Sequence, residues 1–116
     1  MFSSPAYAKW TKVGTTGGGV NTYYVDFERI RKHDGFVYFW DLRDYLKPTG
    51  TGVLSSKVYN QGDCKSFRYK YLSDSYYNQP MGNGDKTGGS NKPGKEWIYP
   101  SPNSSMETVL KSVCSR

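Results

Sequence analysis

The chain has 116 residues, a formal net charge of +6 and 35% hydrophobic residues. This is the length of one ordinary domain, so one hydrophobic core is expected and a second domain is not. No apolar run approaches the roughly 18 residues of a membrane-spanning helix. A basic chain favours acidic partners, but its Lys and Arg residues are scattered, which is equally typical of a solvated surface. The 11 Tyr, 5 Phe, 3 Trp and 13 Gly favour antiparallel β structure with many turns.

Residues 1–8 have the features of the end of an export signal. Ala6-Tyr7-Ala8 fits the small-x-small pattern of a signal-peptidase site. The basic start and the apolar segment of a whole signal are not in the sequence, so either a signal has been trimmed or the match is by chance. The first interpretation makes residues 1–8 a signal-peptide remnant and residues 9–116 a single exported domain.

The first half of the domain predicts strands joined by turns. A short strand over 9–13 leads into a glycine-rich turn at 15–19, and a second strand is expected over 21–27. A charged connection at 28–35 precedes the strongest predicted strand, over 36–45. Both faces of that strand begin apolar, which indicates a central position in the sheet.

The second half continues the pattern after a loop at 47–52. Strands are predicted over 53–60 and about 64–74, with a turn at 61–63 between them, and residues 76–81 are expected to extend the sheet. Residues 82–95 are rich in Gly and Lys and predict a mobile surface loop.

The last segment predicts a helix. Ser104 and Glu107 form a capping box, in which the Ser104 hydroxyl accepts from the Glu107 amide and the Glu107 carboxylate reaches back. Apolar residues then repeat at helical spacing, and Cys114 shares their face: Met106, Val109, Leu110 and Val113. The spacing therefore predicts a short C-terminal helix that packs on the sheet and is tied to it through Cys114.

The two cysteines, Cys64 and Cys114, lack the close Cys or His companions of a zinc or redox motif. An even count with an export remnant favours one disulfide bond, worth roughly 4 kcal/mol for a loop of about 50 residues. The alternative is two buried free thiols in a cytosolic protein.

No catalytic, metal-binding or cofactor-binding constellation is recognisable. His33 is the only histidine, lies in a charged turn and has no nucleophile motif with it. Asp26 and Asp41 lie within aromatic strands and are interpreted as hydrogen-bond acceptors. The remaining acids form neither a glycosidase-like pair nor a metal cluster, so a protein without catalysis is predicted.

Residues 62–77 interleave basic and aromatic side chains, as strands that bind single-stranded nucleic acid do. The RNA-recognition consensus is missing, and a strand with one packed face and one charged face would look the same. Nucleic-acid binding is therefore not favoured, and a protein-binding surface is expected instead. Its candidate residues are Lys65, Arg68, Tyr69, Lys70, Tyr71, Lys86 and Lys92.

The predicted strand over 64–74 contains a conflict. In a regular strand Cys64 shares a face with Arg68 and Lys70, whereas Tyr69 and Tyr71 face the other way. A helix tied to Cys64 would then lie toward the charged side. Either a bulge at residues 62–64 turns the cysteine, or the helix covers only the start of the strand.

The order of motifs along the chain resembles the surface-adhesin protein E family. From Trp10 onward the matching stretches are Asn21-Thr22-Tyr23-Tyr24-Val25-Asp26, Ile30, the 36–42 strand, Lys57-Val58-Tyr59 with Asp63-Cys64, Tyr76-Tyr77 with Gly82, and Pro100 through Leu110 to Cys114. The resemblance implies an α+β fold: an antiparallel sheet of about six strands, with a C-terminal helix held on its concave face by a Cys64–Cys114 disulfide.

The resemblance also implies a small exported bacterial protein without catalysis, in the periplasm, at the cell surface or outside the cell. The best-known adhesin of this type binds vitronectin and laminin, is lipid-anchored and self-associates. Its basic vitronectin determinant corresponds to residues 48–54 here, which contain no Lys or Arg, so that activity is not expected. The expected function is binding of another protein, with self-association left open. The alternative is an accessory subunit of an envelope or membrane-bound complex, which docks through the sheet edge and the 82–95 loop.

Overall fold

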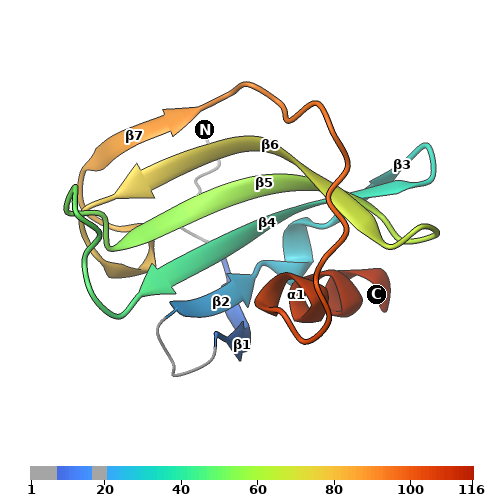
Figure 1. Cartoon of the computed structure of the whole chain (residues 1–116), viewed down its shortest axis with the longest axis horizontal. Helices are drawn as coiled ribbons and strands as arrows, with labels where there is room; N and C mark the ends of the chain where they lie inside the picture. Colours follow the sequence, from blue (N-terminus) through green and yellow to red (C-terminus); the bar gives the residue numbers. More distant parts are fainter. Residues whose placement is uncertain (1–7, 17–20) are drawn as a thin grey trace.

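A computed structural model describes residues 8–16 and 21–116, which form one antiparallel sheet and one α-helix (Figure 1). In chain order the elements are β1 (Thr11–Thr15), β2 (Asn21–Val25), the 3-10 helix η3 (Phe27–Arg29), β3 (Arg31–His33), β4 (Phe36–Tyr45), β5 (Ser55–Asp63), β6 (Arg68–Tyr77), the 3-10 helix η4 (Pro80–Gly82), β7 (Lys86–Ser90) and α1 (Ser105–Cys114). The predicted α+β class is confirmed. The predicted turn at 15–19 and the signal remnant fall largely on residues 1–7 and 17–20, outside the described residues.

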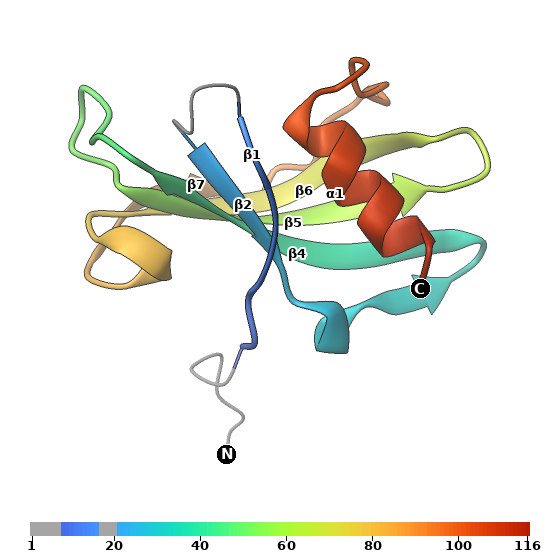
Figure 2. The same ribbon diagram turned by 90° about the horizontal axis from the view of Figure 1, so that it is seen from below.

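Strand β4 lies at the centre of the sheet, as predicted for 36–45. The strand order is β1-β2-β4-β5-β6-β7, and the short β3 also pairs with β4. All neighbouring strands are antiparallel, with Trp40 opposite Tyr59 and Leu42 opposite Tyr24. Strands β1 and β2 curl beneath the sheet and lie beside α1 (Figure 2). One face of the sheet therefore carries the helix and is called the inner face below; the opposite face is called the outer face.

Two segments predicted as connections contain strands. Within 28–35, β3 forms a hairpin with β4, closed by Asp34 and Gly35 at φ 53° and 83°. Within 82–95, β7 pairs with β6 at the sheet edge, so the prediction of a mobile loop is wrong over 86–90. Strand β7 reads Lys-Thr-Gly-Gly-Ser and is mostly exposed. It pairs through backbone groups alone, and no apolar alternation marks it in the sequence.

The turn between β5 and β6 lies later than predicted. Strand β5 continues through Asp63, and the turn comprises residues 64–67. The Asp63 carboxylate accepts a 3.2 Å hydrogen bond from the Ser66 amide, and Phe67 closes the turn at φ 52°. Cys64 thus continues the alternation of β5 and shares the inner face with Gly62, while Arg68 and Lys70 lie on the outer face. The conflict over the direction of Cys64 disappears because the cysteine does not belong to β6.

The core lies between the inner face and α1. Its fully buried side chains are Val25, Phe39, Val109, Leu110 and Val113. The disulfide between Cys64 and Cys114 joins the end of β5 to the last turn of α1, with an S–S distance of 2.07 Å and a Cα–Cα distance of 5.6 Å. The predicted disulfide and the predicted position of the helix are both confirmed.

The helix begins at the predicted cap, with one change in its bonding. The Ser104 hydroxyl accepts from the Glu107 amide at 3.2 Å. The Glu107 carboxylate accepts from the Asn103 amide at 3.0 Å, not from that of Ser104. The Ser104 amide is already bonded to the Ser101 carbonyl, so the carboxylate takes the neighbouring free donor instead.

A polar network is buried beside the apolar core. Asp41 is fully buried; its carboxylate accepts from the Arg43 guanidinium at 2.9 Å and from the Asn60 amide at 2.7 Å. Burial opposes the charge of Arg43, but the adjacent Asp41 carboxylate outweighs burial and raises the pKa of the guanidinium. The guanidinium also lies 5.2 Å and 5.3 Å from the Tyr23 and Tyr71 ring centroids. Asp41 is thus an acceptor within the fold, as predicted.

Candidate binding surfaces

The outer face carries a strip of aromatic and cationic side chains. We call it the outer strip; it consists of Trp10, Arg29, Phe36, Tyr38, Trp40, Tyr59, Arg68, Lys70 and Trp97. Strands β4, β5 and β6 contribute its centre through alternate residues. Trp10 and Trp97, which lie before β1 and after β7, extend it at either end. All three tryptophans of the chain belong to it.

At one end, Trp97 lies beneath two cations. The Arg68 guanidinium carbon is 4.4 Å from the Trp97 ring centroid, and the Lys70 ammonium is 4.7 Å from it. Phe36 contacts the same ring, with centroids 5.6 Å apart. The Tyr99 hydroxyl accepts from Arg68 at 3.4 Å, and its side chain is 63% exposed. The face of an aromatic ring attracts a cation electrostatically, so Arg68 and Lys70 each interact favourably with the Trp97 ring.

At the other end, Arg29 lies between two tryptophans. Its guanidinium carbon is 5.9 Å from the ring centroids of both Trp10 and Trp40. A 2.7 Å ion pair with the buried Asp26 holds the guanidinium in that position. Trp40 continues the strip across the sheet to Tyr59, with ring centroids 4.8 Å apart. Neighbouring side chains therefore contact Trp10, Trp40 and Tyr59 on the outer face.

The cations of the strip differ in how far they are neutralised. Arg68 pairs with Asp63 at 2.8 Å, and this hydrogen bond is the main reason that the pKa of the Asp63 carboxyl lies below its ordinary value. Arg29 pairs with Asp26. No acidic side chain of the described residues lies within ion-pair distance of Lys70. Lys70 is therefore the cation of the outer strip that has no carboxylate partner among the described residues.

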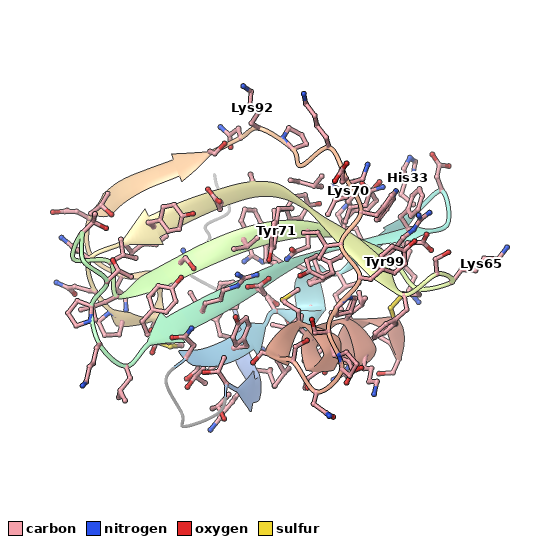
Figure 3. The ribbon with its side chains drawn as sticks, viewed as in Figure 1. His33, Lys65, Lys70, Tyr71, Lys92 and Tyr99 are labelled. Carbon is pink, nitrogen blue, oxygen red and sulfur yellow. A yellow bond between two sulfur atoms is a disulfide. The ribbon has the colours of Figure 1, made fainter. Side chains whose placement is uncertain are left out.

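The structure does not gather the predicted partner-binding residues on one surface. Arg68 and Lys70 lie on the outer face and Lys65 at the tip of the β5–β6 turn (Figure 3). Tyr69 is buried on the inner face, with half-buried Tyr71 beside it. Burial, together with a hydrogen bond to Tyr71, raises the pKa of Tyr69. The two remaining lysines, Lys86 and Lys92, lie in and after β7.

Sequence reasoning missed the tryptophans and Arg29. The alternation of aromatic residues at 36, 38 and 40 could have indicated an aromatic strand face. Nothing local indicates that Trp10 and Trp97 join it, because they come from opposite ends of the chain.

The inner face is open where α1 does not cover it. Two hollows of ≈ 150 Å³ and ≈ 260 Å³ share Tyr45 and Tyr76 as walls. The smaller hollow is also lined by Arg43 and Asp74; Asp74 accepts a 3.1 Å hydrogen bond from the Tyr76 hydroxyl. Burial raises the pKa of Tyr76, with a contribution from that carboxylate. This part of the inner face is polar and lined with tyrosines.

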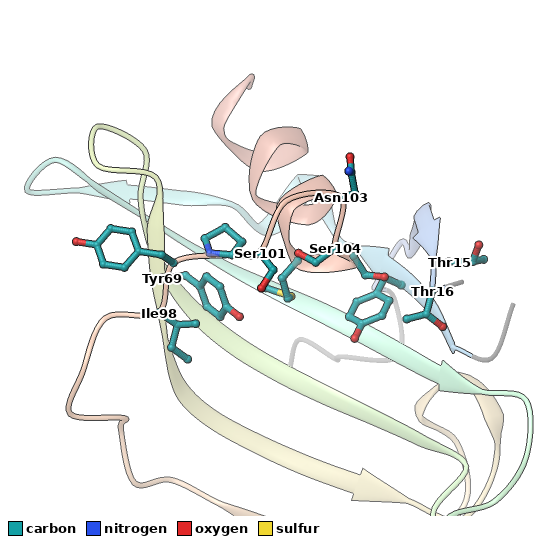
Figure 4. Close-up of a pocket in the computed structure, with 12 residues that line it drawn as sticks. Thr15, Thr16, Tyr69, Ile98, Ser101, Asn103 and Ser104 are labelled. Atoms are coloured by element: carbon teal, nitrogen blue, oxygen red, sulfur yellow. The ribbon is translucent and has the colours of Figure 1, made fainter. Parts of the chain in front are cut away.

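A larger cavity of ≈ 370 Å³ lies at the start of α1 (Figure 4). Thr15 and Thr16 line it on one side, Tyr69 and Ile98 on the opposite side, and the 101–104 turn lies between them. Paired backbone hydrogen bonds of 2.8 Å and 2.9 Å between Ile98 and Tyr69 hold this wall to β6.

The described residues contain neither a cluster of metal-ligand side chains nor a long apolar helix. Within residues 8–16 and 21–116, no group of three or more His, Cys, Asp or Glu side chains could hold a metal ion. The exposed His33 contacts Asp34 at 3.1 Å. No helix in this part of the structure is long and apolar enough to span a membrane.

These features define a class of protein: a small β-sheet module, tied by one disulfide, that presents aromatic surface on a rigid scaffold. The chain belongs to the surface-adhesin protein E family, whose model matches residues 10–115. Membership confirms the family resemblance and the expected binding module, and it implies an exported or cell-surface location. No match was found among curated proteins.

Solved structures of Haemophilus influenzae protein E share the fold. Crystal form II is 18% identical with a TM-score of 0.67, and the alignment covers 98% of this chain and 94% of that one. Protein E from a non-typeable strain is 16% identical with a TM-score of 0.61, covering 98% of this chain and 82% of that one. At this identity the likeness establishes the fold alone.

Proposed function

We propose that this protein is an exported module without catalysis that binds an acidic segment of another protein through the outer strip. The observation that carries the proposal is the gathering of all three tryptophans, with Arg29, Arg68 and Lys70, on one sheet face. Trp, Tyr and Arg are the residues that most often dominate binding energy at protein interfaces.

Rigidity supports this use of the strip. Strands β4, β5 and β6 carry most of its side chains, and ion pairs with Asp26 and Asp63 hold its two arginines. Side chains that are already ordered lose little conformational entropy when a partner binds. The strip therefore meets the requirement for a preorganised binding surface.

Charge defines the class of partner. The chain carries a net charge of +6, and Lys70 has no carboxylate partner among the described residues. A partner segment rich in Asp or Glu could pair with Lys70 while its apolar side chains cover Trp97. Single-stranded nucleic acid offers the same two features, negative charge and stacking rings, but the exported location of the family favours a protein.

Site-specific cross-linking tests the proposal. The photoreactive residue p-benzoylphenylalanine is placed at position 38 on the outer face or at position 45 on the inner face, in cells of the source bacterium and in contact with extracellular proteins. We expect a cross-linked product from position 38 that is lost on Trp97→Ala or Lys70→Glu. The control Lys92→Glu makes the same charge change away from the strip and should leave the product unchanged.

The same experiment can refute the proposal. A product from position 45 alone would assign binding to the inner face. Fluorescence anisotropy gives a second readout, with an Asp- and Glu-rich peptide and a single-stranded oligonucleotide as probes. Binding of the oligonucleotide but not of the peptide would contradict a protein partner.

A second candidate function, an accessory subunit of an envelope complex, is favoured by the open edge at β7. Among the described residues this strand pairs with β6 along one side only, and four of its five residues are exposed. Such an edge can accept a further strand from another chain. Size-exclusion chromatography of native extracts separates the candidates: a small free species argues against the subunit, and comigration with a large assembly supports it.

A further inference from the structure

We infer that the ≈ 370 Å³ cavity at the start of α1 binds a neutral saccharide unit. The cavity lies on the inner face between β1, β6 and the 98–106 segment (Figure 4). None of the residues that line it belongs to the outer strip, so the inference goes beyond the function proposed above.

The lining of the cavity combines hydroxyl and amide groups with apolar surface and is uncharged. The chain contains 16 Lys and Arg and 10 Asp and Glu, yet none of them is among the residues that line the cavity. Hydroxyl and amide groups are dense there, from Thr16, Ser101, Asn103 and Ser104, and Tyr23 and Tyr69 add aromatic surface. A charged ligand would meet no opposite charge, and a purely apolar ligand would leave the hydroxyls without partners. A sugar ring has an apolar C–H face and a rim of neutral hydroxyls. Its face can pack on the aromatic surface of the cavity, and its rim can bond the hydroxyl and amide groups.

Two of the hydroxyls are already oriented. Thr16 Oγ1 accepts from the Asn21 amide at 3.0 Å, and Ser104 Oγ accepts from the Glu107 amide at 3.2 Å. A hydroxyl that accepts from the backbone still has its own hydrogen to donate. Both side chains are therefore fixed in position with a donor available for an oxygen of the ligand.

The walls of the cavity are formed before any ligand binds. Ile98 is held to Tyr69 by two backbone hydrogen bonds, and the Ser101 carbonyl accepts from the Ser104 amide at 3.1 Å. The buried Met106 contributes apolar surface between these walls. A preformed site costs little ordering entropy on binding.

Its size limits the ligand. Pockets for small molecules typically measure about 300–1,000 Å³, and this one lies at the lower end at ≈ 370 Å³. It can enclose one or two sugar rings but not a long oligosaccharide.

Nitrogen-15 NMR titration tests the inference. The probes are galactose, N-acetylglucosamine and lactose, with the anionic 3′-sialyllactose and a proline-rich peptide for comparison. We expect saturable shifts of the Thr16, Ile98 and Ser101 amides with at least one neutral sugar. Ser101→Arg, at an exposed position on the rim, should weaken that binding by at least about tenfold, whereas Asn91→Arg makes the same charge change elsewhere and should not.

Thr16→Val removes one oriented hydroxyl with little change in shape and should weaken binding several-fold. Trp97→Ala should leave sugar binding intact, because the Trp97 side chain belongs to the outer strip and does not line the cavity. The inference is overturned if no neutral sugar moves these amides up to its solubility limit, if only the peptide or the anionic sugar does, or if Ser101→Arg binds as well as the unaltered protein.

Discussion

A charged and polar network is buried in this small protein, formed by Asp41, Arg43 and Asn60. Both oxygens of the Asp41 carboxylate are bonded, to Arg43 and to Asn60, while Arg43 also contacts Met106 Sδ at 3.5 Å. The guanidinium thus connects the sheet to α1 and to the rings of Tyr23 and Tyr71. Such a pair stabilises a fold mainly when both partners are present, because either one alone is a buried uncompensated charge.

Replacing Asp41 alone is therefore expected to destabilise the fold strongly. Asp41→Ala leaves the Arg43 charge buried and should lower the free energy of unfolding by about 3 kcal/mol or more, measured by urea denaturation. The double variant Asp41→Asn with Arg43→Met removes both charges and should be more stable than Asp41→Ala. Equal stability of the two would mean that the lost charge balance is not the cause.

The ion pair between Asp63 and Arg68 makes the free energy of unfolding depend on pH in the acid range. The pKa of Asp63 lies below its ordinary value of 3.8, chiefly because Arg68 donates a hydrogen bond to the carboxylate. A lowered folded-state pKa stabilises the protein above the ordinary value, and this contribution is lost as the pH falls through the folded-state pKa. In Asp63→Asn, the decrease in stability from pH 5 to about pH 3 should therefore be shallower. If the stability of Asp63→Asn fell with pH in parallel with that of the unaltered protein, the Asp63–Arg68 ion pair would not be the source of this pH dependence.

At the scale of elements, the contact between α1 and the sheet depends on the absence of a side chain at Gly62. A Cβ added there would lie 2.9 Å from Val37 Cγ2, 3.1 Å from Leu110 Cδ1 and 3.3 Å from Phe39 Cε1. The helix can approach β5 closely only because this position is glycine. The disulfide next to it, from Cys64, then holds the end of the helix at the same place.

Gly62→Ala should therefore overpack this contact and lower the free energy of unfolding by about 1–3 kcal/mol, measured by chemical denaturation. Gly88→Ala is the matched control, because its added Cβ would meet only Tyr76 Cδ2 at an ordinary 3.5 Å. If both variants lose the same stability, the cause is general to glycine in strands and not the helix contact.

Opening the disulfide tests how far α1 depends on it. The double variant Cys64→Ser, Cys114→Ser should lower the free energy of unfolding by roughly 4 kcal/mol, since the bond closes a loop of 50 residues. Because the apolar face of α1 stays buried, the circular dichroism of the folded variant should keep its helical signal. Loss of that signal under native conditions would show that the helix requires the covalent bond.

At the scale of the whole molecule, charge and aromatic surface are arranged differently on the two faces. The outer face holds tryptophans with cations above them. The inner face holds α1, the uncharged cavity at its start, and a hollow lined by tyrosines with Arg43 and Asp74. One sheet can thus present two unlike surfaces, because alternate residues of each strand point to opposite sides.

The charge difference predicts different responses to salt. Binding of the Asp- and Glu-rich peptide to the outer strip should weaken markedly as ionic strength rises from roughly 0.05 M to 0.5 M, because the Debye length shortens below about 10 Å over that range. Binding of a neutral sugar to the cavity should change little, as followed by anisotropy and NMR respectively. If the affinity for the peptide did not change with salt, opposite charges would not drive the binding, and the proposal of an acidic partner would be wrong.

Elements with local signals could be predicted from the amino-acid sequence. The 36–45 strand and the helix of residues 105–114 follow from apolar periodicity and a capping serine. The pairing of Cys64 with Cys114 is favoured by the even cysteine count together with the export remnant. Three features emerge only in the folded chain: the position of the β5–β6 turn, the strand β7, and the surface that Trp10, Trp40 and Trp97 share. These features depend on backbone pairing and on contacts between distant residues, which leave no periodic mark in the chain. The stretch of residues 62–77 shows the division: its composition indicated a basic and aromatic strand, but the position of the turn decided that Arg68 and Lys70 face outward while Tyr69 and Tyr71 face the helix.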